Sequence, residues 1–335
     1  MRLPDLQYVE PRSLQEACHF LAEHSGESRI VAGGTDLFPS MKQRTVTPKY
    51  VVSLCSIPDL DRLEFDESSG LRIGASVKIR SLEKDRVILE KYPAIAEAAG
   101  EVASWQLREM GTAGGNLNLE TRCFYYNQSD FWRSCRPTCI KMGGETCNAV
   151  GGGKKCFAVF SGDLAPALIA LGASIKLVSV TGERALSLKD YYTGDGAKPI
   201  MRQPQEILVR IDVPPVANNT YSCYLKYRIR RSIDFPVADV AAFVNVEGPE
   251  KTVREARVVI GAVGTKPQEI EEIGKLLAGK SMTDTLMEEA AELAFKAARP
   301  IANTASSFSY RKKMIKVMVK KVLRQALDAP IREVS

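Results

Sequence analysis

The sequence contains little histidine and no long hydrophobic run. Only two of its 335 residues are histidine, His19 and His24, so chemistry that depends on imidazole is not expected to be central. No stretch of eighteen uncharged apolar residues occurs, and Asp5 and Glu10 stand where a signal peptide would need an apolar run. We therefore expect a cytoplasmic chain that does not enter a membrane and relies on cofactors for difficult chemistry.

The charge balance argues against a dedicated nucleic-acid binder. The 46 basic and 40 acidic residues give a formal charge of +6, which is small for a chain of this length. A basic stripe recurs every four residues near the C-terminus, at Lys312, Lys316, Lys320 and Arg324. Such stripes are usually solvated helix faces, and docking of an acidic protein is the alternative. No nucleic-acid partner is expected.

The length predicts two domains, because 335 residues exceed what one hydrophobic core usually supports. Helix and strand signals alternate in the first half, where residues 81–92 are one predicted helix. The second half reads as three strands followed by three helices, the last over 308–329, which is typical of a smaller α+β domain. Prolines and asparagines at 214–219 suggest a linker, so we place the domains at residues 1–217 and 218–335.

Two turns with adjacent glycines carry a binding signal. The GxGxxG fingerprint is absent, so an ordinary NAD fold has no support. Instead, VAGGTDL (31–37) and GTAGGN (111–116) each place a glycine pair directly after a predicted element. Backbone amides there can approach an anion without a Cβ in the way, and a helix starting near Asp36 adds its N-terminal dipole. Both turns suit a pyrophosphate, although a glycine pair more often serves turn geometry alone.

Five of the eight cysteines are crowded into one segment, and the other three are scattered. The crowded ones are Cys123, Cys135, Cys139, Cys147 and Cys156. Disulfides are not expected in a long chain without an export signal. The surrounding segment, about 120–158, lacks helical or strand periodicity, so something other than a hydrophobic core must order it. A four-cysteine zinc site is one possibility, although only Cys135 and Cys139 have zinc-like spacing.

Five segments in fixed order carry a family resemblance: VAGGTDL, GTAGGNLN, GDLAPAL, EILVRIDVP and SYRKKMIKVMVKKVL. They resemble the FAD subunits of molybdenum hydroxylases, the xanthine dehydrogenase and carbon monoxide dehydrogenase family. The resemblance implies an α+β fold: a two-part FAD-binding domain of the vanillyl-alcohol-oxidase and molybdenum-hydroxylase flavoprotein type, followed by a C-terminal α+β domain.

The resemblance also implies which residues contact FAD. The implied set is Ile30, Val31, Ala32, Gly33, Gly34, Thr35, Asp36, Thr112, Ala113, Gly114, Gly115, Asn116, Asp163, Leu208 and Lys226. The two glycine segments would wrap the pyrophosphate and ribityl chain, with Gly34, Gly114 and Gly115 leaving room for phosphate oxygens. Asp163 would bind the ribose or adenine side, and Leu208 and Lys226 would lie close to the flavin. Local alternatives are a helix cap for Asp163, a core position for Leu208 and a solvated strand position for Lys226.

The cysteine segment is an insertion relative to common members of the family. Its motif TRCFYYNQSDFWRS and four of its cysteines resemble the β subunits of 4-hydroxybenzoyl-CoA reductases. That resemblance implies a 4Fe-4S cluster on Cys123, Cys139, Cys147 and Cys156, and four thiolates are what such a cluster requires. Cys135 departs from the pattern, and it lies close enough to Cys139 in sequence for either to serve.

The resemblance implies an electron-transfer subunit with no catalytic residue of its own. Its partners would be a molybdopterin-binding large subunit and a 2Fe-2S small subunit, assembled as a dimer of heterotrimers, with ferredoxin as electron donor. The complex would reductively remove the phenolic hydroxyl of 4-hydroxybenzoyl-CoA. Two alternatives stay open: a flavin subunit of a hydroxylase that oxidises an aromatic or N-heterocyclic substrate, and a zinc-stapled interaction module without enzymatic function.

Overall fold

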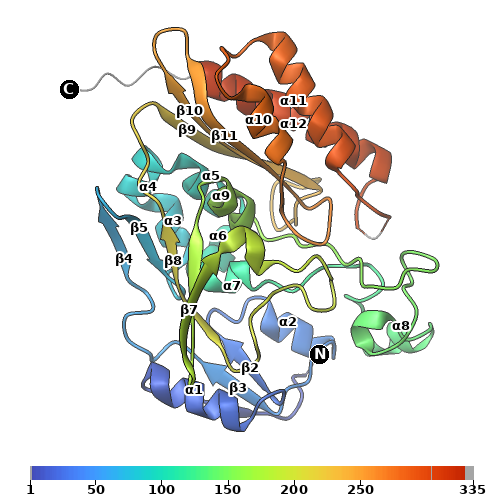
Figure 1. The fold of residues 1–335 in the computed structure, drawn as a ribbon. Helices are drawn as coiled ribbons and strands as arrows, with labels where there is room; N and C mark the ends of the chain where they lie inside the picture. The colour runs from blue at the N-terminus through green and yellow to red at the C-terminus, as the bar shows by residue number, and fades with distance from the viewer. Residues whose placement is uncertain (1, 303, 329–335) are drawn as a thin grey trace.

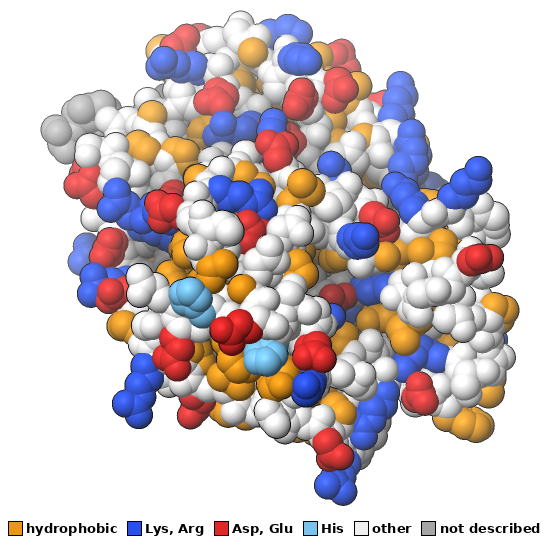
Figure 2. Space-filling view, turned by 60° about the horizontal axis from the view of Figure 1, so that its bottom comes forward, with side chains coloured by type: hydrophobic (Ala, Val, Ile, Leu, Met, Phe, Trp, Pro, Cys, Tyr) orange, Lys and Arg blue, Asp and Glu red, His pale blue; other side chains and the backbone are white. Residues whose placement is uncertain are grey.

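The computed structural model describes residues 2–302 and 304–328. Its N-terminal part is a small parallel sheet with strand order β1-β3-β2 and two helices. The elements are β1 (Gln7–Val9), α1 (Leu14–Glu23), β2 (Ser28–Val31), α2 (Leu37–Lys42) and β3 (Tyr50–Ser53). Helix α1 begins after Ser13, whose hydroxyl accepts a hydrogen bond from the Glu16 amide at 3.1 Å. His19 lies on α1 and His24 directly follows it, on a surface where charges of both signs are interspersed (Figure 2).

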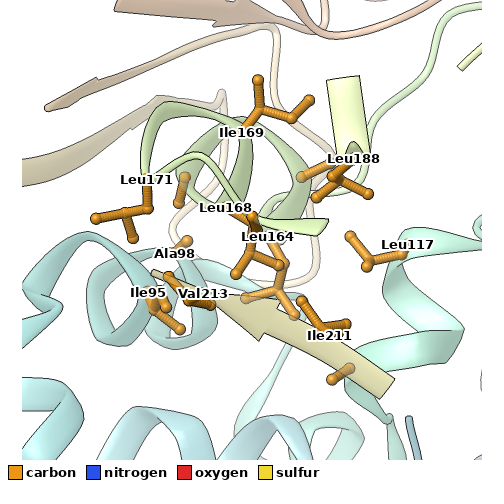
Figure 3. Close-up of a cluster of buried hydrophobic side chains, with 14 of the residues drawn as sticks. Ile95, Ala98, Leu117, Leu164, Leu168, Ile169, Leu171, Leu188, Ile211 and Val213 are labelled. Carbon is orange, nitrogen blue, oxygen red and sulfur yellow. The ribbon is translucent and has the colours of Figure 1, made fainter. Parts of the chain in front are cut away.

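A five-stranded antiparallel sheet of order β4-β5-β8-β6-β7 forms the rest of the first domain's framework. The strands are β4 (Leu63–Asp66), β5 (Gly70–Gly74), β6 (Ser174–Ser179), β7 (Gly182–Ser187) and β8 (Ile207–Val213). The helices are α3 (Ile79–Lys84), α4 (Arg86–Lys91), α5 (Pro93–Glu101), α6 (Trp105–Met110), α7 (Ala113–Leu117), α9 (Leu164–Ala170) and the 3-10 helix η2 (Leu188–Tyr191). Every residue of α9 is buried. Figure 3 shows Leu164 and Leu168 packed toward Ile95 and Ala98 of α5 and toward Ile211 and Val213 of β8.

Three local predictions for this domain differ from the structure. The predicted helix over 81–92 is two helices, because Asp85 has an extended backbone and its carboxylate caps α4 by accepting from the Ile88 amide at 3.0 Å. The predicted tight turn at 111–116 contains the short helix α7. The segment around the cysteines contains α8 (Asp130–Ser134) and the 3-10 helix η1 (Ile140–Met142), neither with a buried residue. Elements this short and exposed produce no periodic hydrophobic pattern.

The second domain is an antiparallel sheet of order β12-β11-β10-β9 with three helices on one face (Figure 1). Its elements are β9 (Thr220–Tyr227), β10 (Ala238–Glu247), β11 (Thr252–Gly261), β12 (Gln268–Glu269), α10 (Glu271–Leu277), α11 (Asp284–Ala297) and α12 (Phe308–Asp328). The predicted α+β class is confirmed, while the predicted helix end at Ala329 lies outside the described residues. No helix in the described part of the chain has both the length and the apolar character needed to cross a bilayer.

Strand β10 joins the two domains because it is buried on both faces. Ala241 and Phe243 pack into the core of the first domain. Val240 and Val244, on the opposite face, pack into the core beneath α11 and α12. The near-continuous apolar run of this strand follows from that double burial.

Most of the basic stripe on α12 pairs with acidic residues of α11. The pairs are Lys316 with Glu288 and Glu292, Lys320 with Glu288, and Arg324 with Asp284. The stripe therefore contributes to the contact between two helices of one domain.

Candidate functional site

The two glycine turns, far apart in sequence, lie side by side. A Cβ on Gly33 would lie 2.1 Å from the carbonyl oxygen of Met110, and a Cβ on Gly111 would lie 3.7 Å from Oγ1 of Thr35. Only glycine at position 33 lets the backbone of the first turn touch that of the second. The structure thus brings together the two segments that the sequence singled out.

The first turn presents a row of unpaired backbone N–H groups. Gly34 has a φ of +67°, the left-handed conformation that glycine adopts without steric cost. Within the described part of the chain, the amides of Gly33, Gly34, Thr35 and Asp36 donate no hydrogen bond. Successive free amides around a left-handed residue form a concavity that suits an anion. The first turn therefore has the geometry expected for a phosphate cradle.

The second turn differs, because two of its amides already donate hydrogen bonds to a neighbouring segment of the chain. The amides of Ala113 and Gly114 donate to the carbonyl oxygens of Val77 at 2.9 Å and Ala75 at 2.8 Å. A Cβ on Gly114 would lie only 2.8 Å from the Cβ of Ala75. The expectation that Gly114 leaves room for phosphate oxygens is corrected, since the space a side chain would need there is filled by Ala75. Gly115, in contrast, is exposed.

Asp163 and Lys226 form a buried ion pair. The Asp163 carboxylate lies 2.9 Å from Lys226 Nζ and accepts a hydrogen bond from the Tyr224 hydroxyl at 2.8 Å. The side chains of Lys226 and Asp163 are 0% and 5% exposed, so Lys226 is not a solvated strand residue. Asp163 does not cap α9 with its side chain. That role falls to Asn116, whose Oδ1 accepts from the Leu164 amide at 3.0 Å.

A second buried carboxylate, Asp239, stands directly opposite Lys226 in the β9–β10 ladder. Neither of its oxygens has a hydrogen-bond partner in the described structure. Gly261 on β11 makes room for it, because a Cβ there would lie 2.1 Å from Asp239 Oδ1. Burial, and then the charge of Asp163, raise the pKa of Asp239 well above its ordinary range. The protein therefore favours a protonated Asp239 beside the ion pair.

Asp239→Asn is expected to flatten the pH dependence of stability. Because the folded-state pKa is raised, the native state keeps a proton that the unfolded chain releases above its ordinary pKa of 3.8. The stability this proton provides is complete below that pH and is lost as the pH rises through the folded-state pKa. Asparagine does not titrate, so the variant does not undergo this loss of stability. Across this pH window the ratio of its folding equilibrium constant to that of the wild type should therefore rise by up to about tenfold per pH unit. Urea unfolding of both proteins from about pH 4 upward measures the difference, and parallel stability curves would contradict the assignment.

The remaining apolar candidates belong to the framework beneath the turns. Leu208 is buried in the main core together with Ala113 and Leu117 of α7. Val31 is buried in a small core with Met41 of α2. Leu208 thus occupies the core position that was its local alternative.

Four cysteines line one cavity. We call residues 120–158 the cysteine loop; it extends from the first domain on the side of α2 and carries α8 (Figure 1). The cavity has a volume of about 20 Å³, and Cys123, Cys139, Cys147 and Cys156 are among the residues that line it. The thiol of Cys135 is exposed outside the cavity and lies 3.3 Å from the carbonyl oxygen of Phe131. Of the two neighbouring cysteines, it is therefore Cys139 that faces the other three.

The thiols of the cavity influence one another. Burial raises the pKa of Cys123, and it raises the pKa of Cys156 to about 11, with smaller increases from neighbouring cysteines of the cavity. Binding a metal centre would require these thiols to deprotonate. Among the described residues, no three His, Cys, Asp or Glu side chains are close enough to hold a single metal ion.

Sequence reasoning missed Tyr224, Asp239 and Arg122. Arg122 pairs with Asp36 of the first glycine turn, and burial lowers its pKa to about 10, which leaves it charged at neutral pH. A single charged residue inside an apolar strand could have pointed to Asp239. No comparable signal marks Arg122, since its partner is distant in sequence.

Comparison with known proteins gives the class of the molecule. Residues 4–216 match the family described as the FAD binding domain in molybdopterin dehydrogenase. Residues 223–326 match the CO dehydrogenase flavoprotein C-terminal domain. The chain therefore belongs to the FAD-binding subunits of the molybdopterin dehydrogenases, a family of oxidoreductases.

Individual relatives agree with this class. The aldehyde oxidoreductase FAD-binding subunit PaoB of Escherichia coli K12 is 31% identical over 288 residues, which covers 80% of this chain and 86% of the relative. The carbon monoxide dehydrogenase medium chain of Afipia carboxidovorans is 28% identical, covering 95% and 96%. The solved structure of reconstituted CO dehydrogenase from Oligotropha carboxidovorans superimposes with a TM-score of 0.80 at 25% identity, covering 97% of this chain and 99% of that one.

Proposed function

We propose that the chain is an electron-transfer subunit that holds FAD in its first domain and one 4Fe-4S cluster on its cysteine loop. The observation that carries the proposal is the convergence of Cys123, Cys139, Cys147 and Cys156 on one cavity. When bound, the cluster exchanges single electrons, and FAD supplies a carrier that can take two. We place the boundary between the two domains near residue 217.

The first glycine turn supports the FAD part of the proposal. Its unpaired amides would bind the pyrophosphate, with the second turn packed beside them. We assign FAD contacts to residues 30–36 and 112–116, and to Asp163, Leu208 and Lys226.

The number of thiols around the cavity supports a cluster, and the lack of a described single-ion site argues against zinc. Zinc binds sulfur at about 2.3 Å in a tetrahedron, so four zinc ligands crowd around a single point. The described cysteines surround a cavity but are not gathered closely enough for one ion. A 4Fe-4S cluster takes one thiolate at each of its four irons, so four cysteines on one cavity supply the required number. Tyr125 and Tyr126 also line the cavity and would shield the cluster from water.

The proposal also covers the partner subunits of the chain, its electron donor and the substrate of the complex. Relatives described as an FAD-binding subunit and as a medium chain support a place in a complex of several subunits. The partners we propose are a molybdopterin-binding large subunit and a 2Fe-2S small subunit, assembled as a dimer of heterotrimers. The cysteine loop has six basic and three acidic residues, and Arg136, Lys154 and Lys155 are exposed. This charge would steer an acidic one-electron donor such as ferredoxin. The substrate we propose for the complex is 4-hydroxybenzoyl-CoA.

A second candidate function follows from the same relatives. Aldehyde oxidoreductase and carbon monoxide dehydrogenase are named for oxidised substrates, and a flavin subunit in such a complex sends electrons outward. The cysteine loop is the feature that favours the reductive assignment, because two-electron exchange between flavin and a nicotinamide needs no single-electron centre.

Thr35→Asp is expected to weaken FAD binding by at least about tenfold, the cost of placing one like charge against the pyrophosphate. Thr35 lies among the four unpaired amides and is partly exposed, so the substitution adds a carboxylate to the cradle without filling the core. Thr47→Asp is the matched control, since Thr47 is exposed on the same domain outside the cradle. Fluorescence titration of FAD-free protein measures both affinities. Equal FAD affinities in the two variants would contradict the assignment of the first glycine turn as the pyrophosphate site.

A further inference from the structure

We propose that occupancy of the cysteine cavity and binding of FAD are thermodynamically coupled through helix α2, with Arg122 and Arg133 as the positioning residues. The inference rests on the proposed function, because it concerns the two groups assigned there. It adds a physical link between them within this chain: the cysteine loop holds α2 at both ends, and α2 begins where the phosphate cradle stops.

The N-terminal end of α2 is held by the residues just before Cys123. Arg122 pairs with the carboxylate of Asp36, and the Glu120 amide donates to the same carboxylate at 3.4 Å. Asp36 is also the last of the residues with unpaired amides in the first glycine turn. A displacement of Arg122 therefore acts directly on the cradle.

The C-terminal end of α2 is held by a second arginine of the same loop. Arg133 donates to the carbonyl oxygens of Gln43 at 3.1 Å and Arg44 at 2.9 Å. The Tyr126 hydroxyl lies 3.4 Å from the carbonyl oxygen of Thr45. Carbonyl groups at a helix end lack intrahelical partners, and a cation there also suits the helix dipole. With a side chain only 9% exposed, Arg133 is a fixed contact.

The groups that hold α2 are continuous with the cavity wall. Cys123 and Tyr126 both line the cavity, and the Tyr126 amide donates to the Cys123 carbonyl oxygen at 3.0 Å. Neither α8 nor η1 has a buried residue, so the outer part of the loop has no hydrophobic core of its own. The two ends of the loop are held by hydrogen bonds to Val159 and to residues 195–196, and its outer part depends on what the four thiols hold and on its contacts with α2. Filling the cavity would therefore favour the position of α2 that shapes the cradle.

Coupling of this kind must be reciprocal. If occupancy of the cavity strengthens FAD binding by some factor, FAD strengthens retention of the cluster by the same factor at equilibrium. Couplings between two sites are commonly about five- to 150-fold in affinity. We expect a value of about tenfold here, since the link consists of two arginines and one short helix.

The experiment is an FAD titration, followed by flavin fluorescence, of the full chain prepared anaerobically with its iron and again after the iron is removed by a chelator. In the wild type, iron removal is expected to weaken FAD binding about tenfold. In Arg122→Gln and Arg133→Gln the ratio of the two affinities should fall toward one. Arg136→Gln is the matched control: Arg136 is exposed on the same loop, stacks over Trp132 at 4.1 Å and has no contact with α2 among those described, so its ratio should stay that of the wild type.

The possible results distinguish a failure of the coupling from a failure of the proposed function. A wild-type ratio of one, with both FAD and iron bound, would overturn the coupling and leave the proposed function intact. An unchanged ratio in both α2-contact variants would overturn the path through α2. A wild type that binds no FAD or no iron would overturn the proposed function and the coupling together. As a second measurement, bound FAD should slow chelator bleaching of the iron absorbance in the wild type but not in Arg133→Gln.

Discussion

Anaerobically prepared Cys147→Ser protein is expected to lose about four irons per chain, the full content of a 4Fe-4S cluster. Cys147 is one of four thiols around the cavity. Without its thiolate, one iron of the cluster has no protein ligand. The loss should therefore be of the whole cluster. Iron and sulfide analysis, together with the visible spectrum, measures it.

Cys135→Ser provides the matched control for that experiment. It makes the same change on the same loop, but the Cys135 thiol is exposed and lies outside the cavity. It is expected to retain all the iron. Loss of iron in Cys135→Ser with retention in Cys139→Ser would exchange the assignments of these two residues.

Removal of the cluster is expected to slow reduction of bound FAD by a one-electron donor to a small fraction of the wild-type rate. The donor would be a low-potential ferredoxin or a reduced viologen, mixed with wild type and with Cys147→Ser in a stopped-flow instrument. FAD should be present in excess, so that weakened flavin binding does not imitate slow electron transfer. The physical reason is that the positively charged cysteine loop is the surface at which such a donor would dock.

NADH, a two-electron donor, tests whether electrons can also reach FAD without the cluster. The isolated chain has no GxGxxG nicotinamide motif, so NADH oxidation should be negligible in wild type and variant alike. If the cluster-free protein is reduced by ferredoxin as fast as the intact protein, electrons do not enter through the cysteine loop. In that case the metal centre would serve only to order the loop.

Local motifs were readable from the sequence, and long-range contacts were not. The first glycine turn was identified from residue type and order, because it depends on its own segment. The crowding of five cysteines was visible in the same way, but the choice of four among them came from family resemblance. The reason given for Gly114 was wrong, since its need for a missing side chain comes from Ala75, a residue of a different segment. The short helix α7 and the break at Asp85 were likewise hidden, because a few residues produce no periodicity.

The buried charges show the same limit. Asp163 and Lys226 were singled out by family resemblance, but their mutual ion pair joins residues from different domains and follows only from the fold. Arg122 looked like one polar residue in a polar loop, and its pairing with Asp36 depends on how the cysteine loop folds back on α2. Sequence patterns identify the groups that carry chemistry more readily than the groups that position them.

The most direct test of the central claim is the metal, sulfide and flavin content of the anaerobically purified wild-type chain, read together with its visible spectrum. The account predicts about four irons and four sulfides per chain with little zinc, and one FAD after reconstitution. The iron absorbance should be present in the untreated protein. Stoichiometric zinc without iron, or four freely titratable thiols in a chain that binds FAD normally, would contradict the assignment of the cysteine loop as the site of an electron-carrying cluster.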